Sequence, residues 1–173
     1  ILEIDRFQFS SSDLVRRYRF LQKMFIDEFS FDDEKTVEEL ISDCIKGFIS
    51  EGIVVPDNSH PDTYNLTSEG LRKLKWFAAF LQPFFESYKT VLIYFSKYPA
   101  GKHEIKEQVK KIHSIGSKQY KKKNILFKES LSQINYKNAV KFFMKNKMTG
   151  NQDTLEIDYY KKIIERLIRL IGA

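Results

Sequence analysis

The sequence predicts a mainly α-helical fold, a helical bundle-like domain with one small β-hairpin. Apolar residues recur at intervals of three and four along most of the 173-residue chain, as in amphipathic helices. A β-branched run, residues 53–55, is separated by a turn-rich stretch from residues 64–66, as in a hairpin. With 42% hydrophobic and 14% aromatic residues, the chain can bury a core of its own.

Two helices with clear start signals are predicted in the N-terminal part. Residues 10–13 (Ser-Ser-Ser-Asp) are typical of a helix N-terminus, and residues 14–25 continue with helical periodicity. Residues 36–39 (Thr-Val-Glu-Glu) fit a capping box that opens a second helix, which Gly52 closes. The single cysteine, Cys44, falls on the apolar stripe of this helix, so we expect a buried structural thiol.

The hairpin is predicted between the second helix and a third one, which Thr67 opens. This order of elements is the pattern of a winged-helix unit, which often binds DNA. The helix in the recognition position, however, carries the acids Glu38, Glu39 and Asp43 against one lysine. Because DNA phosphates would repel such a helix, we expect no nucleic-acid partner.

The remainder of the chain is predicted to be helical. Pro83 suits either the first turn of a helix or a kink. Residues 116–124 read as a lysine-rich linker or a frayed helix, and residues 148–153 as a loop. The helical stretches expected from apolar periodicity are 71–81, 84–98, 103–115, 127–134, 135–148 and 159–171.

Charge is distributed unevenly along the chain, whose net charge is +6. Residues 1–70 hold 7 basic and 15 acidic side chains, whereas residues 97–147 hold 14 lysines and 3 acids. We therefore expect an acidic, winged-helix-like subdomain over 1–70 and a basic helical subdomain over 71–173. The two are expected to pack as one C-terminal unit of a larger chain.

The basic segment is a candidate for contact with an anionic surface such as a membrane, the alternative being a solvated helix face. Its candidate residues are Lys106, Lys110, Lys121, Lys122 and Lys123. Apolar neighbours that would enter the membrane interface are Tyr120, Ile125, Leu126 and Phe127. The longest apolar stretch, residues 76–95, is interrupted by polar and charged side chains, so no transmembrane segment is expected.

A search for catalytic motifs finds none. No histidine has an aspartate five positions later or a cysteine at metal-ligand spacing. There is no Gly-x-Ser-x-Gly sequence and no glycine-rich phosphate loop. We expect no catalytic residue, no metal site and no cofactor in this segment.

Two stretches nevertheless resemble a known family. Residues 80–88 (FLQPFFESY) are similar to a Leu-x-Pro-φ-φ-Glu-Ala/Ser-Tyr sequence, where φ is apolar, in the C-terminal part of glycerol-3-phosphate and dihydroxyacetone-phosphate acyltransferases. Residues 136–143 (YKNAVKFF) resemble a Lys-Asn-Ala-Val-Lys-x-Phe sequence that follows at a similar distance. Residues 159–171 are similar to the final helix of those enzymes, and residues 11–66 resemble the preceding region more loosely.

The resemblance implies part of an enzyme that transfers an acyl group from a CoA or carrier-protein thioester to glycerol 3-phosphate. The family's His-x-x-x-x-Asp pair is missing, and so is its Glu-Gly-Thr/Ser block, since residues 51–53 read Glu-Gly-Ile and 69–71 Glu-Gly-Leu. We therefore expect a non-catalytic accessory domain that packs against the acyltransferase domain of the same chain, peripheral on the cytoplasmic side of a membrane. The alternative is a stand-alone winged-helix-type interaction or regulatory module.

The first of the two stretches is expected to form a helix–helix junction. Pro83 would start or kink the helix, the ring of Phe84 would pack inward, and the Tyr88 phenol would seek a hydrogen-bond partner. Glu86 and Asn138 are expected to be buried hydrogen-bonding groups that fix the packing.

Overall fold

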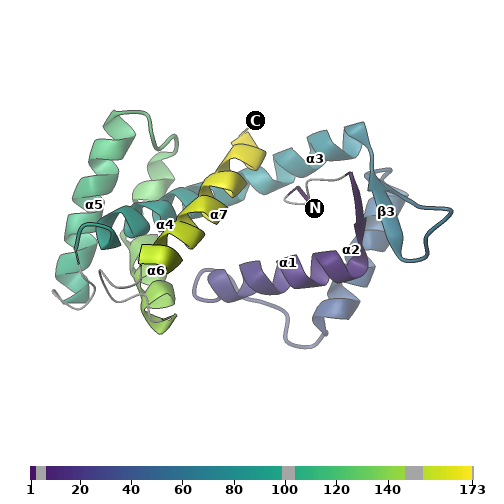
Figure 1. The fold of residues 1–173 in the computed structure, drawn as a ribbon, viewed down its shortest axis with the longest axis horizontal. Coiled ribbons are helices and arrows are strands. Elements are labelled where there is room, and N and C mark those ends of the chain that lie inside the picture. Colours follow the sequence, from purple (N-terminus) through teal and green to yellow (C-terminus); the bar gives the residue numbers. More distant parts are fainter. Residues whose placement is uncertain (3–6, 99–103, 147–153, 173) are drawn as a thin grey trace. The chain divides into compact units, whose positions relative to one another are not determined.

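The computed structural model describes residues 1–2, 7–98, 104–146 and 154–172, and the fold is mainly α-helical (Figure 1). This confirms the predicted fold class. The chain divides into two compact units, residues 1–78 and 79–173.

The first unit combines helices with a small antiparallel sheet. Its elements are β1 (Gln8–Ser10), α1 (Ser11–Met24), α2 (Val37–Ser50), β2 (Val54–Pro56), β3 (Thr63–Leu66) and α3 (Ser68–Ala78). The strand order is β1-β3-β2, with Phe9 opposite Tyr64 and Val55 opposite Asn65. The predicted hairpin is thus present, but β1 adds a third strand that the sequence pattern did not reveal. The winged-helix assignment stays a prediction.

Both predicted start signals form capping boxes. The Ser10 hydroxyl accepts the Asp13 N–H at 3.2 Å, and the Asp13 carboxylate accepts the Ser10 N–H at 3.2 Å. At α2 the Thr36 hydroxyl accepts the Glu39 N–H at 3.2 Å, and the Glu39 carboxylate accepts the Thr36 N–H at 2.8 Å. Because each pair satisfies amides that have no partner within the helix, these four residues determine where α1 and α2 begin.

Helix α2 ends at Ser50, and Gly52 closes it as predicted. This glycine has a φ of +67°, a conformation that L side chains rarely adopt. Its N–H binds the Ile49 carbonyl at 3.0 Å, and the Ile53 N–H binds the Phe48 carbonyl at 2.8 Å. The two bonds form a Schellman motif, which turns the chain from α2 into β2.

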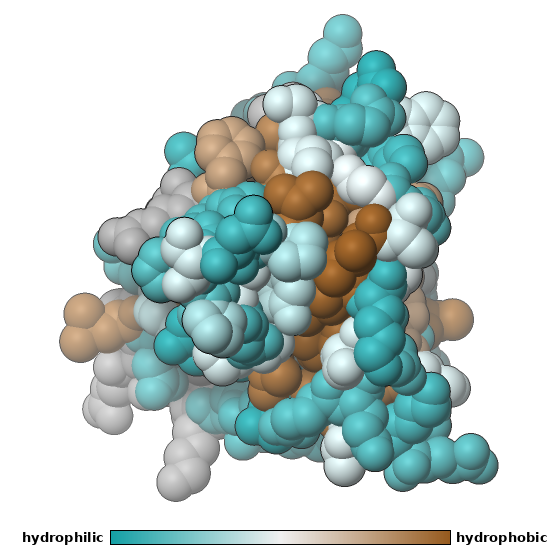
Figure 2. All heavy atoms as spheres, turned by 90° about the vertical axis from the view of Figure 1, so that its right-hand side faces the viewer, coloured by the Kyte–Doolittle hydropathy of each residue, from teal (hydrophilic) through white to brown (hydrophobic). Residues whose placement is uncertain are grey.

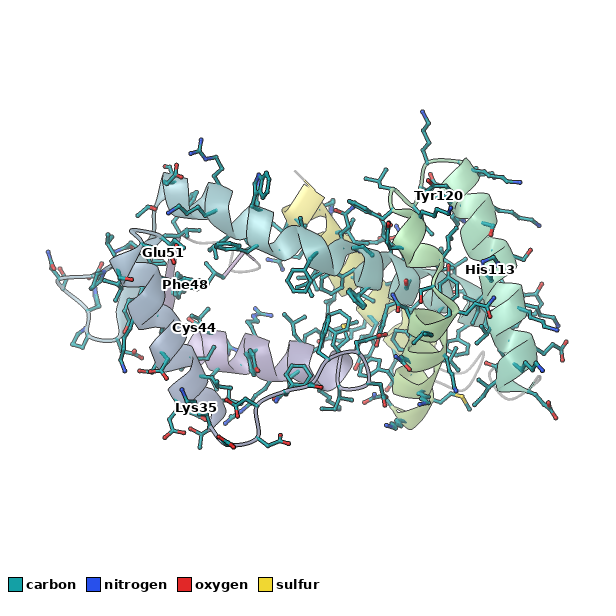
Figure 3. All side chains as sticks on the ribbon, turned by 180° about the vertical axis from the view of Figure 1, so that it is seen from behind. Lys35, Cys44, Phe48, Glu51, His113 and Tyr120 are labelled. Carbon is teal, nitrogen blue, oxygen red and sulfur yellow. The ribbon has the colours of Figure 1, made fainter. Side chains whose placement is uncertain are left out.

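The expectation that Cys44 is buried is wrong, because its side chain is exposed on α2 (Figure 3). The buried side chains of this helix are Ile41 and Ile45. Cys44 lies about 80° around the helix from the midpoint of that pair, at the edge of the apolar stripe. The core of this unit consists of Phe9, Leu14, Ile41, Ile45, Ile53, Val54 and Leu74.

The second unit is a helical bundle around α4, which contacts α5, α6 and α7. Figure 1 shows α7 crossing α4 and running past α6. Its elements are η1 (Ala79–Leu81), α4 (Gln82–Phe95), α5 (Ile105–Lys121), η2 (Lys128–Leu131), α6 (Gln133–Lys145) and α7 (Thr154–Gly172). The stretch expected over 127–134 is therefore a short 3-10 turn followed by the start of α6. The loop expected at 148–153 lies outside the described residues.

Helix α5 continues through most of the stretch that was expected to be a linker or a frayed helix. Gly116 is buried within α5, and a Cβ placed there would lie 2.2 Å from the Tyr136 hydroxyl oxygen on α6. The glycine thus permits α5 and α6 to approach closely, and that contact keeps its part of α5 in the bundle.

Candidate functional site

The central polar group of the second unit is Glu86, on the buried face of α4. Its side chain is 2% exposed. One carboxylate oxygen accepts a hydrogen bond from the Gln82 amide nitrogen at 3.1 Å and one from the Leu126 N–H at 3.2 Å. The other accepts the Phe127 N–H at 3.3 Å and the Ser130 hydroxyl at 2.5 Å. Both oxygens are therefore occupied by donors from this unit, as a buried carboxylate requires.

The partners of Glu86 belong mainly to the segment that joins α5 to α6. A second link from α4 reaches this segment, because the Ser87 hydroxyl donates to the Ser130 carbonyl at 2.9 Å. The Ile125 side chain, 4% exposed, anchors the segment in the core. Together these contacts fix the backbone from Ile125 to Ser130 against α4.

The other residues of the predicted junction lie around the same helix. Pro83 stands in the first turn of α4, where it costs no hydrogen bond, and Phe84 beside it is partly buried. Tyr88 is fully buried. Its ring centroid lies 6.1 Å from that of Phe142 and 5.8 Å from that of Phe143. Asn138, also buried, lies on α6.

A buried phenol lies near this junction. Burial raises the pKa of Tyr136 to about 12, and the Thr90 hydroxyl opposes that shift only in part. Thr90 itself donates to the Glu86 carbonyl at 2.8 Å. Tyr136 is therefore neutral at physiological pH, and its ring and hydroxyl serve the α5–α6 contact.

The lysines predicted to meet an anionic surface are all exposed, but they do not form one cluster. Lys106 and Lys110 are exposed on α5, whereas Val109 and Ile112 of the same helix are buried. The others follow at its C-terminal end, where Lys121 closes α5 and residues 122–123 begin the connection to η2.

The apolar residues expected beside these lysines divide into two groups. Ile125 is buried, so the expectation that it enters a membrane interface is wrong. Tyr120, Leu126 and Phe127 are exposed. Figure 3 shows Tyr120 on the last turns of α5, the end that carries Lys121.

The first unit has a shallow groove along α1, α2 and the hairpin, with Val15, Ile45 and Ile49 among its lining residues. Figure 2, which views the side of Figure 1 on which α2 and β3 lie, shows hydrophobic side chains gathered in a hollow with a hydrophilic border. On the rim, Arg19 pairs with Glu38 at 2.6 Å. These two rim charges thus neutralise one another.

The sequence profile described as glycerol-3-phosphate acyltransferase C-terminal region matches residues 1–152 of this 173-residue chain. The chain belongs to this family. A search of curated proteins found no match. The family match includes the N-terminal part, which resembles the family only loosely in its residues. It ends before the final helix, α7 (Thr154–Gly172), so the predicted likeness of that helix to the family's last helix stays a prediction.

The two stretches that carried the resemblance to the acyltransferase family are packing partners. Tyr88 lies in the first stretch, 80–88, and its ring meets two rings of the second, 136–143. The family's sequence pattern is therefore explained here by the contact between α4 and α6. A short apolar pattern with one glutamate and one tyrosine is what such a buried contact requires.

Sequence reasoning missed the partners of Glu86. Ser130 lies 44 positions away, and two of the four donors are backbone amides, which leave no trace in a residue pattern. Among the described residues of this acyltransferase-family chain, no three His, Cys, Asp or Glu side chains are grouped so as to hold a metal ion. Within the same residues, no helix has the length and apolar character needed to cross a bilayer.

Proposed function

We propose that this chain is a non-catalytic accessory domain of a glycerol-3-phosphate acyltransferase, which supports the catalytic domain of the same protein by packing against it. The observation that carries the proposal is the match of residues 1–152 to the C-terminal region of that enzyme family. The acyl donor is a CoA or carrier-protein thioester and the acceptor is glycerol 3-phosphate, as the resemblance implies.

The chemistry of the chain supports a non-catalytic role. None of its three histidines is followed by an aspartate five positions later, which supports a general base supplied by another domain of the protein. Glu86, the single carboxylate of α4, has both oxygens engaged by donors of its own unit. These hydrogen bonds support a structural role for Glu86 within the unit.

Membrane placement is the second part of the proposal. Residues 97–147 carry 14 lysines and 3 acids, and a basic surface of this kind is attracted to anionic headgroups. The contact that we propose is peripheral and on the cytoplasmic side, as the resemblance to the membrane-associated enzymes led us to expect.

The test of the accessory role is an acyl-transfer assay on the purified chain, with labelled glycerol 3-phosphate and either palmitoyl-CoA or palmitoyl carrier protein. We expect no product above a protein-free control. An acyltransferase domain of the family serves as the positive control in the same assay. Turnover by the chain alone would refute the non-catalytic role, provided that the activity stays with the chain through a further purification step.

A further inference from the structure

The connection between α5 and α6 presents lysines and apolar side chains side by side. We refer to residues 120–123 together with residues 126–128 as the basic tip. Leu126 is 64% exposed and Phe127 is 38% exposed. Between the two halves of the tip, the buried Ile125 ties the chain to the core, so the side chains on either side of it point outward from a fixed position.

The backbone under these exposed side chains is held in place by a buried carboxylate. Glu86 accepts the N–H groups of both Leu126 and Phe127, at 3.2 Å and 3.3 Å. Burying a carboxylate is costly unless it is fully hydrogen-bonded, and here the bonds fix two residues whose side chains remain exposed. A loop that merely connected two helices would need neither the buried carboxylate nor the exposed leucine.

Charge distinguishes the possible partners of the tip. Residues 118–129 contain five lysines and one glutamate. Among the described residues, none of these five lysines forms an ion pair with an acid. Residues 97–147 contain no arginine. Protein–protein interfaces are enriched in arginine and depleted of lysine, whereas flexible lysines suit a diffuse layer of anionic headgroups.

We infer that the basic tip docks on an anionic lipid bilayer, with the side chains of Leu126 and Phe127 entering the headgroup–acyl boundary and the surrounding lysines contacting the headgroups. This inference rests on the proposed membrane placement of the domain and names the surface that achieves it. Apolar side chains enter the boundary region, basic ones stay at headgroup level, and Tyr120 is suited to the interface by its ring and hydroxyl.

A fluorescent reporter tests insertion directly. Trp76 is the single tryptophan, and it is 83% exposed on α3. In a Trp76→Phe background, Phe127→Trp places the only tryptophan in the tip, and Leu155→Trp places one at an equally apolar but distant position on α7, 84% exposed in the native chain. With vesicles of phosphatidylglycerol and brominated phosphatidylcholine, we expect a blue shift and quenching of the fluorescence of the tip reporter. We expect neither for the α7 reporter, nor for Trp76 in the unsubstituted chain.

Matched substitutions test the contributions of apolar contact and charge in vesicle sedimentation. Lys122→Gln/Lys123→Gln removes two tip charges, and Lys97→Gln/Lys162→Gln removes two exposed charges elsewhere. At about fivefold per lysine, the tip pair should weaken binding to anionic vesicles about 25-fold, and more than the control pair. Leu126→Ser/Phe127→Ser, which keeps both N–H donors to Glu86, should weaken binding about tenfold. Far-ultraviolet circular dichroism verifies that each variant is folded.

The inference is overturned if the chain fails to sediment with anionic vesicles, if neutral vesicles bind it as well, or if the α7 reporter is quenched while the tip reporter is not. It is also overturned if the tip variants bind vesicles normally but lose affinity for the acyltransferase domain, since the tip would then be a protein interface. None of these measurements depends on acyl transfer. The accessory role can therefore stand if the tip inference fails, and the tip inference can stand if the accessory role fails.

Discussion

Replacing Glu86 with alanine is the sharpest test of how α4 holds the second unit together. The substitution removes the acceptor of four hydrogen bonds, from Gln82, Leu126, Phe127 and Ser130. The donors of Gln82 and Ser130 are buried and would be left without this partner. An unsatisfied buried donor costs about 1–3 kcal/mol, whereas water can replace the acceptor for the N–H groups of Leu126 and Phe127. We therefore expect the free energy of unfolding to fall by about 3–5 kcal/mol.

Urea unfolding followed by circular dichroism measures this loss, and hydrogen exchange at the amides of Leu126 and Phe127 locates it. Glu129→Ala is the matched control, since it removes an exposed carboxylate from the same connection and should change stability by less than about 0.5 kcal/mol. Glu86→Gln keeps the shape but replaces one acceptor oxygen with a donor, so it should fall between the two. If Glu86→Ala costs no more than Glu129→Ala, the carboxylate does not anchor the loop and the account of the junction is refuted.

Three further predictions concern the two units separately. Gly116→Ala should destabilise the second unit by about 1–3 kcal/mol in urea, because its Cβ would meet the Tyr136 hydroxyl at 2.2 Å; an unchanged midpoint would contradict this. Gly47→Ala, where nothing lies within 4 Å of the new Cβ, should instead raise stability by up to about 1 kcal/mol, as helix propensity predicts. Hydrogen bonds, first from the Asn65 side chain, hold the pKa of Asp57 well below its usual range. The stabilisation that Asp57 gives is complete above the unfolded-state pKa of about 4 and is lost as pH falls below it. Acid titrations followed by circular dichroism should therefore show less pH dependence for Asp57→Asn than for the native chain, and equal pH dependence would contradict this.

Local signals made the helices of the first unit predictable. The pairs Ser10–Asp13 and Thr36–Glu39 act within one helical turn, and Gly52 acts through its own backbone angle, so each could be read from neighbouring residues. Strand β1 could not, because three residues carry no alternation and its partner β3 lies more than fifty residues away. Its existence depends on a pairing between distant segments, which no local pattern encodes.

The positions of single side chains were predicted less well than the helices that carry them. Cys44 matched the apolar spacing of α2, yet the core is centred on two isoleucines and leaves the thiol at the margin. Ile125 and Leu126 are neighbours in a connection without regular structure, where burial does not follow a period. The connection is held by backbone bonds to the distant Glu86, a contact that no local pattern reveals.

The central claim is that this chain supports an acyltransferase domain without carrying out the reaction. The most direct measurement is the rate of glycerol 3-phosphate acylation by a purified acyltransferase domain of the family as this chain is titrated into it. The account predicts a saturable rise in rate, or in the lifetime of activity at 37 °C, at a chain concentration where the chain alone gives no product. A rate and lifetime that stay constant at every concentration, with no complex on size-exclusion chromatography, would contradict it.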